Sequence, residues 1–178
     1  MGSPRLDALK LYNRAVALGE LSVVEDNLFN FSSLYQTNYE FRHLVRQSGL
    51  SLEDRVKGVL SLSCFKKSSV FETLLPILIE SRDLERTQAF NDNFTKVVDE
   101  KLGRVTVLLT SAVALPDESV KSIQKDLERI LNNKVHLRHV IEENLVAGIV
   151  IRLPNGKIYD FSLKKELAEF KSFVLEKE

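Results

Sequence analysis

The apolar residues of this chain change their spacing at Arg104, and this change limits the fold more than any other feature of the sequence. Before Arg104 they recur every three or four residues, which is the repeat of one face of an α-helix. After it, "RVTVLLTSAV" alternates Val105, Val107 and Leu109 with their neighbours, a pattern typical of a β-strand. The 178 residues suffice for two small domains, which we predict over residues 1–104 and 105–178.

The first half is predicted to be a bundle of about six short helices. Gly19, Asn38 and Ser48-Gly49 interrupt the apolar repeat at positions suited to helix ends. Ser51 is a candidate N-cap, because its hydroxyl can accept a hydrogen bond from a free N–H group of the first turn. Helices this short need mutual packing to be stable in water, so we expect an antiparallel bundle.

The second half is predicted to have the order β-α-β-β-β-α. The segment "PDESVKSIQKDLERILNN" returns to the helical repeat, and "VHLRHVI", "GIVIRL" and "KIYDF" are strand-like. The last segment, "SLKKELAEFKSFVLEK", is expected to be a helix capped by Ser162. The predicted fold is therefore mainly α, with a six-helix N-terminal bundle followed by a small C-terminal α/β domain.

The turn between the last two strands determines which residues pair. Pro154-Asn155-Gly156 fits a three-residue loop, since Pro cannot donate a flanking hydrogen bond and Gly accepts the left-handed position. This loop pairs Arg152 with Ile158, and it directs Tyr159 and Phe161 to the core face together with the alternate residues of the preceding strand. Asp160 then lies on the other face beside Arg152, which favours a structural role over a catalytic one.

Composition limits the function classes. Lys+Arg and Asp+Glu both total 25, and neither half has the positive excess that binding to a phosphate backbone relies on. A small α+β nucleic-acid-binding module stays an alternative, because a β-α-β-β-type domain invites that comparison. No apolar run approaches the roughly 18 residues of a transmembrane helix. We expect a soluble intracellular protein that serves a membrane only through a partner.

The sequence offers little for catalysis or metal binding. His136 and His139 would point to opposite faces of a strand, which does not suit shared coordination, and Cys64 is distant in sequence. The sequence contains neither a Gly-rich phosphate loop nor a G-x-S-x-G elbow. We therefore expect no catalytic residue, no metal and no cofactor. A small enzyme with a site between the halves stays open as an alternative.

The segment "VFETLLPILIE" is apolar on almost every side, whereas a surface helix usually has one apolar stripe. It is either the central helix of the bundle or a helix with a second face reserved for a partner. Pro76 is expected to bend it or loosen a turn.

These segments resemble the delta subunit of the bacterial rotary ATP synthase, whose family includes the mitochondrial oligomycin-sensitivity-conferring protein. The matching features are "VTVLLTSA", "VIEENLVAGIVIRL" and "IYDFSLKKEL", and more weakly "FETLLPILIESRDLERTQAFNDNF" and the opening "LYNRAVALGEL". Two departures are Ala147-Gly148, where the family usually has two glycines, and Phe161, where it usually has Gly.

The resemblance implies a non-catalytic peripheral-stalk subunit at the cytoplasmic face of the cell inner membrane, held there through the complex. Such subunits join the catalytic head to the stalk and resist rotor torque. The bundle clasps the N-terminal helix of an alpha subunit with its first and fifth helices, and the C-terminal domain meets the stalk b subunits. Carried over to this chain, the predicted partner-binding residues are Tyr12, Ala15, Val16, Leu18, Leu74, Leu75, Leu78 and Ile79.

Overall fold

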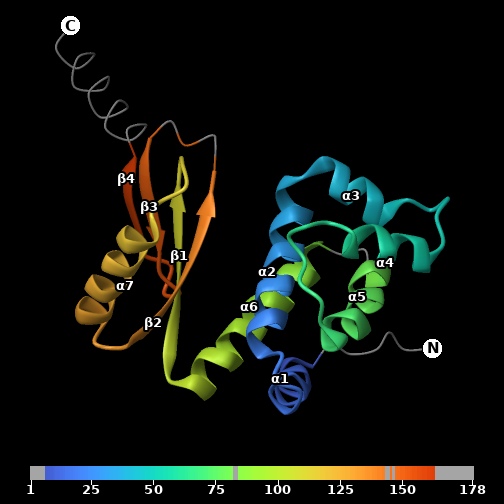
Figure 1. Cartoon of the computed structure of the whole chain (residues 1–178), viewed down its shortest axis with the longest axis horizontal. Coiled ribbons are helices and arrows are strands. Elements are labelled where there is room, and N and C mark those ends of the chain that lie inside the picture. The colour runs from blue at the N-terminus through green and yellow to red at the C-terminus, as the bar shows by residue number, and fades with distance from the viewer. Residues whose placement is uncertain (1–6, 82–83, 143–144, 146, 163–178) are drawn as a thin grey trace, which may run out of the picture. The chain divides into compact units, whose positions relative to one another are not determined.

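The computed structural model describes residues 7–81, 84–142, 145 and 147–162 (Figure 1). The chain divides into two compact units, Met1–Val98 and Asp99–Glu178, which we call the helical unit and the sheet unit. Among the described residues, helices come first and strands follow, so the predicted change from helix to strand is confirmed and the fold is mixed α/β. The helix expected after Ser162 lies outside the described residues.

Six described helices precede the first strand. They are α1 (Ala8–Ala17), α2 (Leu21–Thr37), α3 (Tyr39–Arg46), α4 (Leu52–Leu60), α5 (Ser69–Ser81) and α6 (Leu84–Leu102). Side chains cap three of them as the local sequence favours. The Ser51 hydroxyl accepts from the Asp54 N–H at 3.1 Å, which confirms the predicted cap of α4, and Asn38 and Asp7 cap α3 and α1 in the same way.

Aromatic rings fill the middle of the helical unit. Phe31 meets Phe41 edge to face with ring centroids 5.3 Å apart, and Phe65 stacks on Phe71 at 5.6 Å. These rings come from α2, α3, the segment before α5, and α5 itself. The short helices are therefore held together by one shared apolar core.

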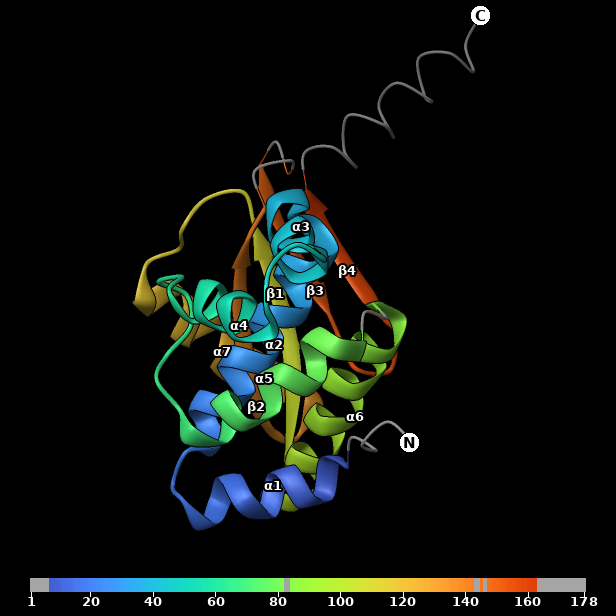
Figure 2. The same ribbon diagram turned by 90° about the vertical axis from the view of Figure 1, so that its right-hand side faces the viewer.

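The sheet unit consists of β1 (Arg104–Ser111), α7 (Asp117–Leu131), β2 (Lys134–Ile141), β3 (Gly148–Arg152) and β4 (Ile158–Ser162). The strands lie in the order β2-β1-β3-β4, with β1 parallel to β2 and antiparallel to β3. Helix α7 packs against β2, and its Leu127 joins Val107, Leu109 and Ile151 in a small core. Figures 1 and 2 show the strands of this unit and α7 in two views at right angles.

The β3–β4 hairpin has the predicted register. Arg152 pairs with Ile158, and the Leu153 N–H donates to the Lys157 carbonyl at 2.9 Å across the three-residue loop. The expectation that Tyr159 and Phe161 would be buried is wrong, because they are 45% and 60% exposed. The reason is topological: β4 is an edge strand, and α7 packs against β2 at the opposite edge of the sheet.

A carboxylate ties the end of α6 to the start of β1. Asp99 accepts from the Arg104 Nε at 3.0 Å, the Thr106 N–H at 2.7 Å and the Thr106 hydroxyl at 2.8 Å. Between Asp99 and Arg104 in the chain, Gly103 has a φ of 58°, the left-handed conformation that commonly ends a helix. The change from helix to strand at Arg104 is therefore fixed by side-chain hydrogen bonds as well as by the backbone.

Candidate protein-binding site

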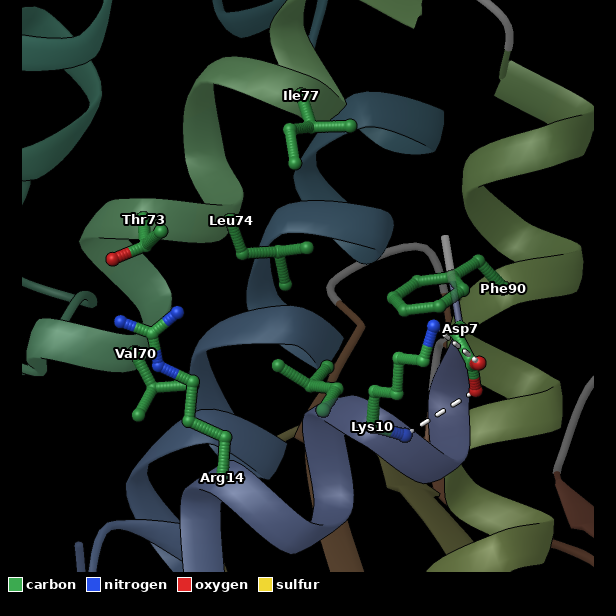
Figure 3. A pocket seen from close by; sticks show the side chains of 9 residues that line it. Asp7, Lys10, Arg14, Val70, Thr73, Leu74, Ile77 and Phe90 are labelled. Atoms are coloured by element: carbon green, nitrogen blue, oxygen red, sulfur yellow. Dashed lines mark hydrogen bonds and ion pairs between the residues drawn. The ribbon is translucent and has the colours of Figure 1, made fainter. Parts of the chain in front are cut away.

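A groove of about 190 Å³ runs between α1 and α5 in the helical unit (Figure 3). Its apolar lining comes from three helices: Leu11 of α1, Val70, Leu74 and Ile77 of α5, and Phe90 of α6. Leu11, Val70, Leu74 and Phe90 are at least nine-tenths buried, whereas Ile77 is half-buried. The floor is thus continuous with the core, and Ile77 is the apolar side chain most open to a partner.

Polar side chains form the α1 side of the groove. Asp7, the N-cap of α1, and Lys10 and Arg14 within α1 follow one another at helical spacing, and Thr73 lines the groove from α5. Lys10 Nζ lies 3.7 Å from the Asp7 carboxylate, so these two charges partly offset each other. Arg14 leaves a positive charge at the rim, beside an apolar floor.

Glu20 sets the start of α5. Its carboxylate accepts from the Ser68 hydroxyl at 2.6 Å, the Ser69 hydroxyl at 2.9 Å and the Val70 N–H at 3.1 Å. The hydrogen bond from Ser68, followed by that from the Val70 N–H, lowers the pKa of Glu20 to about 2. One carboxylate therefore holds the first turn of α5 to the connection between α1 and α2.

Two asparagines hold the segment before α5 against α2. The Asn27 amide donates to the Lys66 carbonyl at 2.7 Å and accepts from the Lys66 N–H at 2.9 Å. Asn30 donates to the Cys64 carbonyl at 2.8 Å. Asn27 is fully buried, so both of its bonds lie away from water, where a lost partner is costly.

The eight predicted partner-binding residues are not gathered in this groove. Leu74 lines it. Leu75, Leu78 and Ile79 are buried in the core of the helical unit, as is Ala15, and Tyr12 packs partly against that core. Val16 and Leu18 are exposed but do not line the groove.

The physical reason lies in α5, which contacts α1, α2 and α4 and so buries more than one of its faces. Of the two interpretations of the segment "VFETLLPILIE", the burial of α5 favours the central helix, with a narrow open strip at Thr73 and Ile77. The residues that sequence analysis missed are Leu11, Arg14, Ile77 and Phe90. The helical spacing of Leu11 and Arg14 was visible, but only packing shows which side of α1 is open.

An apolar floor beside a charged rim is suited to the apolar face of an amphipathic helix. Among the described residues, no group of three or more His, Cys, Asp or Glu side chains is placed to hold a metal ion. No described helix has the length and apolarity that crossing a membrane requires. The apolar floor and charged rim of the groove therefore define a surface of the class suited to another protein.

Comparison with known proteins agrees with this class. A family model described as "ATP synthase delta (OSCP) subunit" matches residues 8–173, and the chain belongs to this family. It is 22% identical to the ATP synthase subunit delta of Pelagibacter ubique, over 95% of this chain and 91% of that protein. It is 26% identical to the subunit delta of Fervidobacterium nodosum, over 96% of this chain and 94% of that protein. It is 27% identical to the subunit delta of Anaeromyxobacter dehalogenans, over 96% of this chain and 96% of that protein.

The family contains non-catalytic subunits of the ATP synthase, so the prediction that this chain is a structural subunit and not an enzyme is confirmed. The resemblance noted in the sequence is confirmed as well, and it extends over most of the chain.

Proposed function

We propose that this chain is the peripheral-stalk subunit that joins the alpha subunits of the catalytic head to the stalk b subunits, at the cytoplasmic face of the inner membrane. The α1–α5 groove carries the proposal, because its apolar floor and charged rim suit the N-terminal helix of an alpha subunit. The role is mechanical: the chain makes and breaks no bonds, and it transmits force between two partners that it holds.

In this proposal the alpha-subunit helix lies in the groove. Leu74, Ile77 and Phe90 offer the surface for apolar side chains at i, i+3 and i+4 of the partner (Figure 3). Arg14 at the rim suits a carboxylate on the polar side of the same helix. The predicted residues Tyr12, Val16 and Leu18 then extend the proposed contact along α1, outside the groove itself.

The sheet unit is proposed to meet the b subunits. Its support is the set of large apolar side chains that this unit leaves exposed on β4, namely Ile158, Tyr159 and Phe161. Exposed aromatic groups of this kind are enriched in protein interfaces, where they supply contact area at a low entropic cost.

The test is titration calorimetry of the full chain against a synthetic peptide of the alpha subunit's N-terminal helix. We expect one-to-one binding, weakened about tenfold or more by Ile77→Asp, because a carboxylate would be placed on the apolar floor. Leu9→Asp is the matched control, since Leu9 is an exposed residue of α1 that does not line the groove.

The variant Val16→Asp tests whether the predicted residues of α1 that lie outside the groove also contact the alpha subunit. A loss of affinity with Val16→Asp would show that the alpha-subunit contact extends to the predicted residues of α1. If Ile77→Asp binds as tightly as the unchanged protein while the circular dichroism spectrum is unaltered, the groove is not the alpha-subunit site.

A further inference from the structure

A second exposed surface lies on α3, away from the α1–α5 groove. Four side chains of α3 follow the i, i+3, i+4, i+7 spacing of a single helix face, and this face is opposite the one that Phe41 and Val45 bury. With Gln47 and Ser48 they line a hollow of about 400 Å³. The four are Tyr39, Arg42, His43 and Arg46.

The hollow is aromatic and basic, although the chain is neutral overall. Tyr39 is 73% exposed, and its ring centroid lies 6.4 Å from that of His43. Glu40 is the acidic residue of α3, and it does not line the hollow. The lining therefore presents two permanent positive charges to solvent without a carboxylate among them.

Both guanidinium groups are held in place by the end of α2. Arg42 Nη1 donates to the carbonyl oxygens of Tyr35 and Gln36. Arg46 Nε donates to the Tyr35 hydroxyl at 2.9 Å, and its guanidinium lies 5.5 Å from the centroid of the Tyr35 ring. Tyr35 is almost fully buried, so both arginine side chains are fixed to a rigid part of the helical unit. Binding of a ligand would therefore cost little side-chain entropy.

These anchors leave hydrogen-bonding capacity unused. Arg46 uses only Nε, and its Nη1 and Nη2 make no hydrogen bond to another described residue. Arg42 donates through Nη1, and its Nη2 is likewise available to donate to a ligand. Planar guanidinium nitrogens one helical turn apart match two carboxylates that are one turn apart on another helix.

We propose that this hollow binds a short acidic helical segment of a second protein, with carboxylates at i and i+4 that meet Arg42 and Arg46. The neutral chain favours a short acidic segment over a nucleic acid, which would need a longer basic surface.

The surface is separate from the groove. α1 precedes the start of α2 and α3 follows its end, as Figure 1 shows within the helical unit. A 17-residue helix is roughly 25 Å long, so the two sites lie at opposite ends of α2 and can be occupied together. One bound partner at each end would hold the helical unit at two points.

Amide chemical shifts of the full chain test the proposal. The probe is an alanine-rich helical peptide with glutamate pairs at i and i+4, compared with the same peptide carrying glutamine. We expect the glutamate peptide to produce saturable shifts across residues 39–48 and the glutamine peptide to produce none. Arg46→Gln should weaken binding roughly threefold to fivefold, and the double variant Arg42→Gln/Arg46→Gln should abolish saturation.

Lys57→Gln is the matched control, because it removes one exposed positive charge from α4 in the same unit and should leave the affinity unchanged. The proposal is overturned if the glutamine peptide shifts residues 39–48 equally, or if neither peptide shifts them. It is also overturned if inorganic phosphate or a single-stranded oligonucleotide binds this surface more tightly than the glutamate peptide.

Discussion

The helical unit and the sheet unit differ in how much apolar surface they bury. Among the described residues, the core of the helical unit contains twenty buried apolar side chains and that of the sheet unit six. The helical unit leaves a narrow strip open between α1 and α5, whereas the sheet unit leaves the large side chains of Tyr159 and Phe161 about half exposed. Among the described residues, the larger core is thus accompanied by a groove between helices, and the smaller core by exposed side chains on the edge strand β4.

Two adjacent residues of α5 test how sharply the helical unit separates core from groove. Leu78 is 1% exposed, so Leu78→Asp places a charge in the core and should destabilise the unit by about 4 kcal/mol or more. Ile77→Asp, at the groove, should cost about 1 kcal/mol. Urea unfolding followed by far-ultraviolet circular dichroism measures both. Equal losses would mean that the groove and the core are not distinct.

Gly148 tests how far the small core of the sheet unit can absorb strain. Its φ is 96°, and a Cβ there would lie 2.2 Å from the Phe161 carbonyl oxygen, so Gly148→Ala should destabilise the unit by about 3 kcal/mol. Gly156→Ala is the control. Gly156 has a φ of 81° but open space around it, and only the backbone cost of about 1 to 2 kcal/mol is expected. Native-state hydrogen exchange of β3 and β4 separates the two variants.

Asp99 is the first residue of the sheet unit, and its contacts test what holds the start of β1 in place. Asp99→Ala removes three hydrogen bonds and leaves Arg104 without this carboxylate, which should cost about 2 kcal/mol. Asp92→Ala removes an exposed carboxylate from the same helix and is expected to have little effect. Chemical denaturation followed separately by amides of α2 and β1 checks the result. Similar losses in the two variants would contradict the importance of this contact.

Glu20 makes the stability of the helical unit depend on pH. Its pKa falls from 4.5 to about 2 on folding, so its contribution is complete above pH 4.5 and is lost as the pH falls through about 2. Glu20→Gln should flatten the dependence of stability on pH in this range, as thermal unfolding at a series of pH values would show. Glu72→Gln, which removes an exposed carboxylate from α5, is the control. An unchanged slope in Glu20→Gln would contradict the contact with Ser68 and Val70.

Features set by local sequence were predictable. The Ser51 cap and the register around Pro154 to Gly156 follow from hydrogen bonding within a few residues, and both are confirmed. The sequence also showed that Ala147 departs from the family's usual glycine. The structure places the demanding backbone conformation at Gly148, the position where glycine is kept.

Features set by contacts between distant residues were not predictable. The pairing of Asn27 with Lys66 and of Glu20 with Ser68 joins positions far apart in the chain, and no periodicity signals it. The apolar repeat of α5 could not show which side of the helix stays open, because that depends on where α1, α2 and α4 pack. Distant packing also explains the exposure of Tyr159. The alternation of residues in β4 predicted the face on which Tyr159 lies, but it could not predict how far α7 covers that face.

The position of β1 has a mechanical consequence. The chain enters the sheet unit directly into an inner strand, which pairs along eight residues with β2 and along four with β3. A force applied along β1 would therefore load the hydrogen bonds to β2 and those to β3 in shear at the same time. A strand at the edge of a sheet, in contrast, can separate from its one neighbour bond by bond. The Asp99 contacts to Arg104 and Thr106 lie at the point where this tension enters. The junction between α6 and β1 is therefore expected to resist a force applied along β1 more strongly than a force that peels a strand from the edge of the sheet.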